Sequence, residues 1–86
     1  MKPIKIAPSL LAADFLQFGC EIDQIIKAGA DELHMDVMDG HFVPNLTFGP
    51  PLISQIKAKK SIFLDVHIMV ANPEQVATSY LKAGAD

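Results

Sequence analysis

The sequence contains no arginine, and its seven lysines are spread along the chain apart from a group at Lys57, Lys59 and Lys60. A nucleic-acid surface needs a denser basic stripe, so we predict that the protein does not bind nucleic acid. The lysine group instead fits the solvated end of a helix, where the helix dipole favours positive charge. A hydrophobic content of 50% and a net charge of −3 are typical of a globular domain.

Cysteine is nearly absent as well, since Cys20 is the only one. A single cysteine excludes an internal disulfide and favours a reducing compartment. Cys20 falls opposite the apolar stripe of its expected helix, which predicts a free thiol rather than a nucleophile. The sequence also shows no signal-peptide pattern after Met1 and no apolar run long enough to cross a membrane. We therefore expect a cytoplasmic protein with no membrane partner.

Apolar periodicity divides the chain into alternating strands and helices. Strands are expected at residues 4–8, 32–38 and 61–69. The first helix is expected to start with a capping box at Asp14 and end at Gly29, the second to begin at Pro50 and Pro51, and the third to run from a capping box at 72–75 to Gly84. This βαβαβα order favours parallel strands with helical crossovers.

A five-residue repeat, KAGAD, occurs at residues 27–31 and again at 82–86. The first copy closes a helix and leads into a strand, so the second predicts another strand after it. Three βα units in this length scale to roughly 230 residues for eight units, within the range of a (β/α)8 barrel. We expect residues 1–86 to be the N-terminal part of a single (β/α)8 (TIM) barrel domain, ending before the fourth strand. The alternative is a small open α/β sandwich that is complete in itself.

Histidines and aspartates alternate with apolar residues on two of the expected strands. Side chains alternate along a strand, so His34, Asp36 and Met38 share one face, as do Phe63, Asp65, His67 and Met69 on the next strand. Adjacent strands lie about 4.8 Å apart, so His34, Asp36 and His67 can converge. Two imidazoles and a carboxylate suit Zn²⁺, Fe²⁺ or Mn²⁺. The alternative is that each is a polar core residue satisfied by hydrogen bonds.

The remaining polar residues give weaker signals. Ser9 follows the first expected strand and fits either a substrate contact or a helix-entry turn, and Asp65 fits either a partner of the metal ligands or a buried charge. Asp39 and Gly40 are expected to shape a turn. A Schiff-base aldolase needs a lysine at the carboxyl end of a strand, and the sequence offers none there.

Three motifs together resemble the ribulose-phosphate 3-epimerase family: SLLAADF at 9–15, HMDVMDGHFVPNLTFGP at 34–50 and DVHIMV at 65–70. The resemblance extends along the chain and includes both AGAD segments. It implies a (β/α)8 barrel enzyme that interconverts D-ribulose 5-phosphate and D-xylulose 5-phosphate in the pentose phosphate pathway. The reaction would remove the C3 proton through an ene-diolate.

The resemblance also implies roles for particular residues. His34, Asp36 and His67 would bind one divalent metal ion (Zn²⁺, Fe²⁺, Mn²⁺ or Co²⁺), and Asp36 would also exchange a proton with the substrate. Ser9, His67, Met38 and Met69 would contact the sugar phosphate. A fourth ligand that is also the second acid/base, together with the phosphate-binding loops, would lie beyond residue 86. The protein is further expected to form a homo-oligomer.

Two other interpretations of function stay open at this point. The protein could epimerise another ketose phosphate, such as allulose 6-phosphate, because the residues that discriminate between sugars are expected outside residues 1–86. It could also be a non-catalytic binding or structural fragment. Residues 1–86 alone are expected to be inactive, since they supply one of the two carboxylates that the reaction needs.

Overall fold

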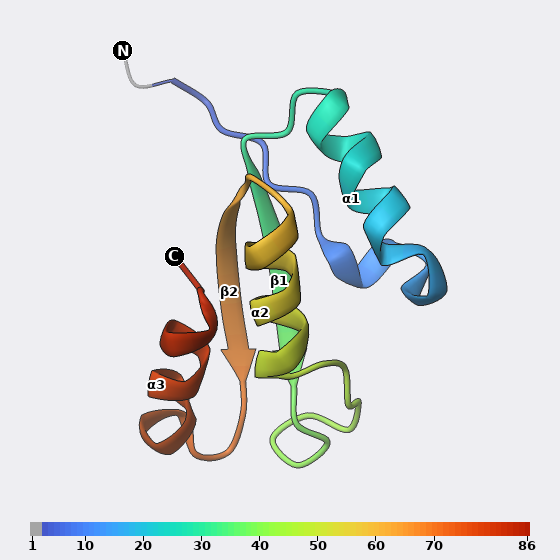
Figure 1. Ribbon diagram of the computed structural model, residues 1–86. Coiled ribbons are helices and arrows are strands. Elements are labelled where there is room, and N and C mark those ends of the chain that lie inside the picture. The colour runs from blue at the N-terminus through green and yellow to red at the C-terminus, as the bar shows by residue number, and fades with distance from the viewer. Residues whose placement is uncertain (1–2) are drawn as a thin grey trace.

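The computed structural model describes residues 3–86 and shows an α/β arrangement around two parallel strands (Figure 1). Along the chain the elements are the short 3₁₀-helices η1 (Leu10–Ala12) and η2 (Phe15–Gln17), then α1 (Phe18–Lys27), β1 (Glu32–Met38), α2 (Pro50–Lys59), β2 (Phe63–Met69) and α3 (Pro73–Ala83). The expected strands at 32–38 and 61–69 are therefore confirmed, the second beginning two residues later than predicted. Among residues 3–86, no helix is long and apolar enough to cross a membrane.

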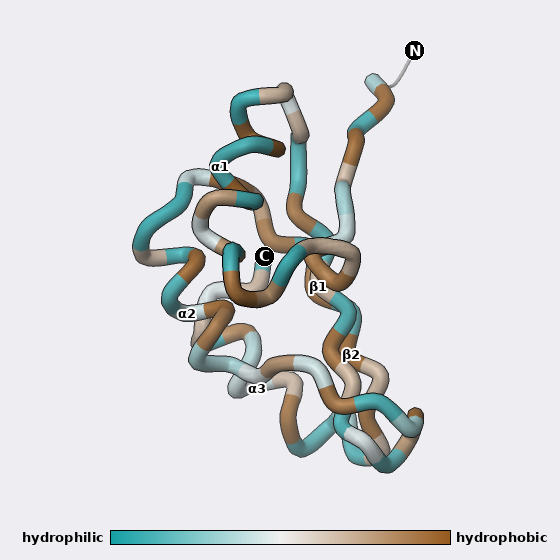
Figure 2. The backbone as a smooth tube through the Cα atoms, turned by 90° about the vertical axis from the view of Figure 1, so that its right-hand side faces the viewer, coloured by the Kyte–Doolittle hydropathy of each residue, from teal (hydrophilic) through white to brown (hydrophobic). Residues whose placement is uncertain are grey.

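The helices all lie on one side of the two strands (Figure 2). The strand side chains that face them are apolar, and Leu33, Met35, Val37 and Leu64 are buried. From the helices, Ile22, Ile53, Ile56 and Tyr80 complete this core. Each such buried aliphatic or aromatic side chain stabilises the fold by about 1.5–3 kcal/mol. The core thus holds the helix layer on one face of the sheet. The other face, called the polar face below, carries His34, Asp36, Asp65 and His67 together with the apolar side chains of Met38, Phe63 and Met69.

The two strands pair in a register that brings equivalent residues side by side. His34 lies opposite Asp65, Asp36 opposite His67 and Met38 opposite Met69. Burial along β1 alternates between buried and partly exposed residues, which confirms the predicted division into two faces. Because the strands are parallel, both carry their polar side chains to the same face at the same depth.

The expected strand at residues 4–8 is not a strand in the structure. The segment runs parallel to β1, and its carbonyls at Ile6 and Pro8 accept hydrogen bonds from Glu32 and His34. However, Pro8 has no N–H to donate, and the Ile6 N–H donates to the Asp31 side chain. Only a single bridge, Ser9 to His34, completes the pairing. The segment therefore lies where a strand would lie beside β1 but lacks the regular series of hydrogen bonds that defines a strand.

Both predicted capping boxes are wrong in detail. Asp14 does cap a helix, accepting from the Leu16 N–H at 3.0 Å, but the helix is the 3₁₀ turn η2. The α-helix α1 begins only after Gln17, whose side chain makes no capping bond. At α3, the Asn72 side chain donates to the Gln75 side chain at 2.8 Å and caps no backbone N–H. The helix starts nevertheless stand close to their predicted places, and α2 begins with Pro50 and Pro51 as expected.

The KAGAD repeat forms the same structure twice. Gly29 and Gly84 have positive φ angles of 99° and 123° and end α1 and α3. The aspartate two residues later then makes two bonds with an earlier segment. Asp31 donates its N–H to the Ile6 carbonyl and accepts the Ile6 N–H on its side chain, and Asp86 makes the same pair of bonds with Leu64. Each copy thus fixes the chain that follows a helix beside the segment that precedes that helix.

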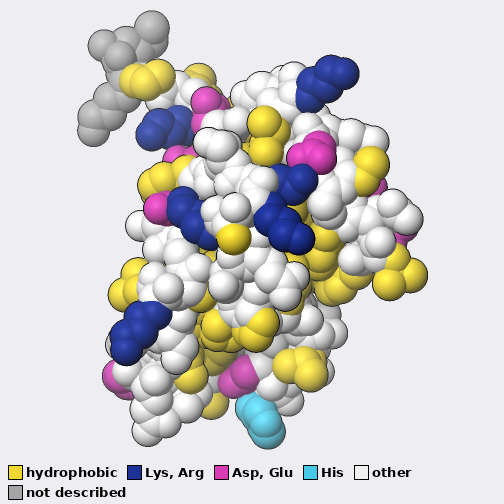
Figure 3. Space-filling model, in the orientation of Figure 1, with side chains coloured by type: hydrophobic (Ala, Val, Ile, Leu, Met, Phe, Trp, Pro, Cys, Tyr) yellow, Lys and Arg dark blue, Asp and Glu magenta, His cyan; other side chains and the backbone are white. Residues whose placement is uncertain are grey.

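The surface agrees with two further predictions. On the face shown in Figure 3, two lysines lie next to each other near the middle, and the others lie apart among acidic, hydrophobic and uncharged groups. Lys57 and Lys59 lie in the last turn of α2, as predicted for a solvated helix end. Lys60 pairs with Asp23 of α1 at 2.7 Å. Cys20 is a free, exposed thiol, also as predicted.

Candidate metal centre

His34, Asp36 and His67 meet on the polar face of the sheet. Each offers one ligand atom, and the three atoms lie within 4.8 Å of one another. The Asp36 Oδ1 atom lies 2.8 Å from His34 Nε2 and 3.3 Å from His67 Nδ1. The structure therefore confirms that these side chains converge, as strand alternation and parallel pairing predicted. Their role as metal ligands stays a prediction.

His34 and Asp36 are hydrogen-bonded to each other and His67 lies 3.3 Å from Asp36, but the three residues do not belong to the core. His34 and Asp36 are partly buried, whereas the His67 side chain is 59% exposed. Within residues 3–86, no charged or polar residue is buried. The alternative of polar residues satisfied within a core is therefore right only in that His34 and Asp36 are hydrogen-bonded, since none of the three residues is buried. The polar face is open to an incoming ligand.

Both ring nitrogens of His34 face carboxylates. Nε2 lies 2.8 Å from Asp36, and Nδ1 lies 2.9 Å from Oδ2 of Asp65 on β2. The hydrogen bond that Asp65 accepts is the main reason that the pKa of His34 is raised, while partial burial opposes the rise and Asp36 adds to it. Asp65 is exposed, so the idea that it is a buried charge is wrong, and its contact with His34 fits the other interpretation.

Thr47 holds the end of β1, a role that sequence reasoning missed. Its hydroxyl accepts the Met38 N–H and donates to the Asp36 carbonyl, both at 3.0 Å. These two backbone groups lie beyond the point where residues 6–9 stop pairing with β1. The Thr47 side chain thus supplies the backbone of Asp36 and Met38 with hydrogen bonds that a neighbouring strand would otherwise make. Its place inside the long motif at 34–50 was the one available signal, since nothing in its spacing indicates this contact.

Asp39 joins the loops that follow the two strands. Its Oδ1 accepts the N–H groups of His41 and Phe42, and its Oδ2 accepts the Ala71 N–H at 2.9 Å. These hydrogen bonds, chiefly that from Ala71, lower the pKa of Asp39. The predicted turn role of Asp39 and Gly40 is confirmed, and Gly40 has a φ of 77° that suits glycine. Asp39 also orders the second loop, which was not predicted.

The candidate substrate-contacting residues border this site. Met38 and Met69 lie opposite each other at the carboxyl ends of the strands. Ser9 bridges to His34 through the backbone, and its hydroxyl accepts the Leu11 N–H at 3.3 Å at the start of η1. The helix-entry role of Ser9 is therefore present, and a substrate contact stays a prediction. Substrate contacts by Met38, Met69 and His67 likewise stay predictions.

The donor set fits a divalent cation. Four-coordinate Zn²⁺, with bonds of about 2.0–2.2 Å, holds its ligand atoms roughly 3.3 Å apart. The Asp36–His67 separation of 3.3 Å already matches this spacing, and the 2.8 Å between Asp36 and His34 is slightly shorter. The three ligand atoms lie within 4.8 Å of one another, so the histidines would need to move closer together to bind one ion.

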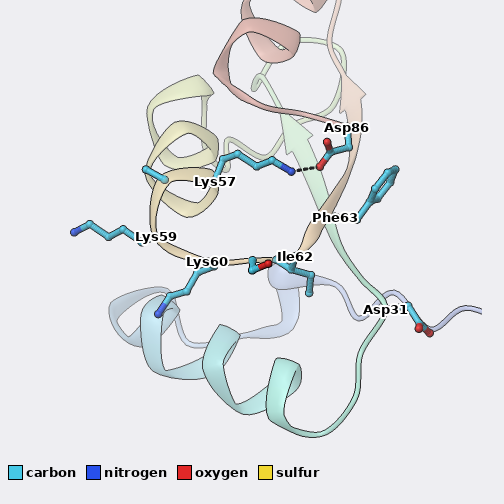
Figure 4. Close-up of a pocket in the computed structure, with 9 residues that line it drawn as sticks. Asp31, Lys57, Lys59, Lys60, Ile62, Phe63 and Asp86 are labelled. Carbon is cyan, nitrogen blue, oxygen red and sulfur yellow. Dashed lines mark hydrogen bonds and ion pairs between the residues drawn. The ribbon is translucent and has the colours of Figure 1, made fainter.

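A hollow of about 730 Å³ lies at the opposite end of the strands. Its lining includes Asp31, Phe63 and the lysines Lys57, Lys59 and Lys60 at the end of α2 (Figure 4). Lys57 points to Asp86 and forms an ion pair with it. The pKa of Asp86 is lowered mainly by Lys57 and also by the Leu64 N–H. The carboxyl ends of the strands, where barrel enzymes place their chemistry, lie away from this hollow.

Comparison with known proteins gives one consistent family. A model described as the Ribulose-phosphate 3 epimerase family matches residues 5–86. The ribulose-phosphate 3-epimerase of Rhodobacter capsulatus is 52% identical over 85 residues, covering 99% of this chain and 37% of that protein. That of Bacillus subtilis is 49% identical over 83 residues, covering 96% and 38%. The cytoplasmic isoform of Oryza sativa is 51% identical over 81 residues, covering 94% and 36%.

The chain thus spans little more than a third of the length of these relatives while matching them almost from end to end. The matched region includes the strand pair, the three converging side chains and both KAGAD segments. Since the family model covers nearly the whole chain, the chain belongs to the Ribulose-phosphate 3 epimerase family.

Proposed function

We propose that this chain is the N-terminal part of a (β/α)8 barrel that interconverts D-ribulose 5-phosphate and D-xylulose 5-phosphate by epimerisation at C3. The observation that carries the proposal is the convergence of His34, Asp36 and His67 on one face of two parallel strands. The family assignment supports the reaction, because the relatives are named ribulose-phosphate 3-epimerases.

The barrel is supported by the way the ends of the chain meet the sheet. Residues 6–9 lie along one edge of β1, and β2 occupies the other. Asp86 bonds to Leu64 of β2 just as Asp31, which leads into β1, bonds to Ile6. A strand that continued from Asp86 would therefore extend the parallel sheet along β2. The helices cover only one face, as the outer layer of a barrel does.

Asp36 is the group we assign to proton transfer. Its carboxylate lies on the open polar face, and its backbone carbonyl accepts a hydrogen bond from the Thr47 hydroxyl. It would remove the proton from C3 on one face of the sugar, and a second carboxylate from a later strand would deliver a proton to the other face. Met38 and Met69, side by side at the strand ends, would form an apolar wall against the substrate and keep water from it.

His34, Asp36 and His67 would hold a divalent metal ion, with Nε2 and Nδ1 as the histidine donors. When bound, the ion supplies Lewis-acid stabilisation of the negative charge that develops on the substrate oxygens. The two imidazoles would keep Asp36 oriented toward the sugar. The phosphate would be bound by later strands, where barrels commonly hold it.

The test compares full-length protein with Asp36→Asn. Purified protein should contain a divalent metal, and Asp36→Asn should lose metal and slow epimerisation of ribulose 5-phosphate by at least about 10²–10⁴-fold, the usual contribution of a general base. Asp23→Asn is the matched control, because it removes an exposed carboxylate that pairs with Lys60 far from the site. Metal-free protein together with an active Asp36→Asn variant would refute the proposal.

Two further assays address the substrate and the fragment. Allulose 6-phosphate in the same assay shows whether the enzyme prefers another ketose phosphate, in which case the proposed substrate is wrong. Purified residues 1–86 should show no turnover, because the second carboxylate is expected outside them. Turnover by residues 1–86 would contradict the assignment of the second carboxylate to a later strand.

A further inference from the structure

We infer that Asp65 is a positioning residue that fixes the orientation and tautomer of His34, so that the bare Nε2 atom of His34 faces the bound cation. The inference rests on the proposed metal site. It starts from the hydrogen bond of 2.9 Å between Asp65 Oδ2 and His34 Nδ1. Asp65 itself is not one of the three residues whose ligand atoms converge.

The contact follows from the sheet. Asp65 and His34 are register partners on neighbouring parallel strands, so their side chains leave the same face at the same level. His67 and Asp36 form the next pair toward the carboxyl ends. Asp65 therefore contacts Nδ1 of His34, while Asp36 contacts Nε2. The imidazole ring is held between two carboxylates that have different tasks.

The tautomer of His34 depends on the groups at its two ring nitrogens. A neutral imidazole carries one N–H, and an ionised carboxylate can only accept a hydrogen bond. Both ring nitrogens of His34 face carboxylates, so these two contacts alone do not place the proton. With Nε2 and Asp36 both bound to a cation, Nε2 would carry no proton, and Asp65 would accept the remaining N–H at Nδ1. Carboxylate partners of this kind raise the basicity of a histidine ligand, and their loss typically weakens metal binding by about 10–100-fold.

Asp65 contributes little else to the fold. Its side chain is 50% exposed, and the core on this strand is formed from the opposite face by Leu64. An exposed pair of this kind is worth about 0–1 kcal/mol of stability. The isosteric variant Asp65→Asn should therefore fold. Its amide can present an NH₂ group to Nδ1, which lets His34 adopt the wrong tautomer.

The test measures Zn²⁺ affinity of the full-length protein by competition with a chelator. Asp65→Asn should bind Zn²⁺ about 10–100-fold more weakly, and Asp65→Glu, which keeps a carboxylate, should recover part of this loss. Asp23→Asn again controls for the lost negative charge and should bind as the unaltered protein does. Equal losses in Asp65→Asn and Asp65→Glu would overturn the inference.

A spectroscopic readout separates positioning from a general structural effect. In the Zn²⁺-loaded protein, the His34 Nδ1–H should give a hydrogen-bonded ¹H–¹⁵N ring signal. Asp65→Asn should shift that signal or broaden it by exchange, while the backbone spectrum stays that of the folded protein. An unchanged ring signal and unchanged affinity would refute the role of Asp65 alone. Failure of the unaltered protein to bind Zn²⁺, Mn²⁺ or Co²⁺ would instead refute the metal site and, with it, this inference.

Discussion

Replacing Gly84 with alanine should destabilise the protein more than the same change at Gly29. Both glycines end a helix with positive φ, 123° at Gly84 and 99° at Gly29. A Cβ at Gly29 would meet nothing within 4 Å, whereas a Cβ at Gly84 would lie 2.7 Å from Cγ and 2.9 Å from Cβ of Lys57. At both sites an alanine must adopt a positive φ, but only at Gly84 does its Cβ also clash with Lys57. Gly29→Ala is therefore the matched control.

The magnitudes can be separated in the same way. A left-handed conformation costs an alanine about 1–2 kcal/mol, and the reduced entropy of the unfolded chain offsets about 0.4–1 kcal/mol of that at either site. Overpacking adds about 1–3 kcal/mol, and only Gly84→Ala incurs it. The Lys57 Cβ cannot move away freely because it is fixed to α2. We therefore expect Gly84→Ala to cost about 1–3 kcal/mol more than Gly29→Ala.

Urea unfolding of the full-length variants, followed by circular dichroism, measures this difference. A double-mutant cycle with Lys57→Ala then tests the cause, because that change removes the Cγ atom and keeps the Cβ. The cost of Gly84→Ala should fall in the Lys57→Ala background. Equal costs at the two glycines, or strict additivity in the cycle, would show that the close approach of Lys57 does not limit residue 84.

Three further predictions concern single contacts. Thr47→Val should destabilise the protein by about 1–3 kcal/mol in urea unfolding, because it leaves the Met38 N–H and the Asp36 carbonyl unpaired. The same change should slow turnover. Thr47→Ser, which keeps the hydroxyl, should resemble the unaltered protein in both the unfolding and the turnover assay. Asp31→Ala should cost about 0.5–1.5 kcal/mol in urea unfolding through the lost bond to Ile6, and a neutral result would mean that water replaces the carboxylate. Folding lowers the pKa of Asp39 below its unfolded value near 3.8. The stability that Asp39 contributes is therefore complete above pH 3.8 and is lost as the pH falls through the lower pKa of the folded state. Asp39→Asn should accordingly make the free energy of unfolding depend less on pH in this acid range.

The part of the site that lies on regular strands could be predicted from the sequence. Alternation placed His34 and Asp36 on one face and Leu33, Met35 and Val37 on the other, and the burial pattern of β1 agrees. Parallel pairing then required His67 to approach Asp36, and the register confirms it. These predictions succeed because side-chain direction in a strand depends only on residue parity.

The remaining contacts depend on paths that residue parity does not determine. Thr47 reaches the backbone of Asp36 only because the loop after β1 folds back along that strand. The strand expected at residues 4–8 fails because Pro8 lacks a donor and Ile6 gives its N–H to a side chain. The Asn72 capping box fails because two neighbouring side chains bond to each other. Each is a choice between competing hydrogen bonds, which composition and periodicity do not resolve.

The KAGAD repeat connects the fold to the site. Glycine ends the helix, and the following aspartate bonds through its backbone N–H and its carboxylate to the segment before that helix. Two bonds from one residue set both the neighbour and the register of the chain that follows. At Asp31 this chain is β1, so the clamp to Ile6 aligns β1 with the segment that ends at Ser9, beside His34. The alignment of His34 and Asp36 with the segment that ends at Ser9 therefore depends on Asp31, which precedes β1 and is not itself a site residue.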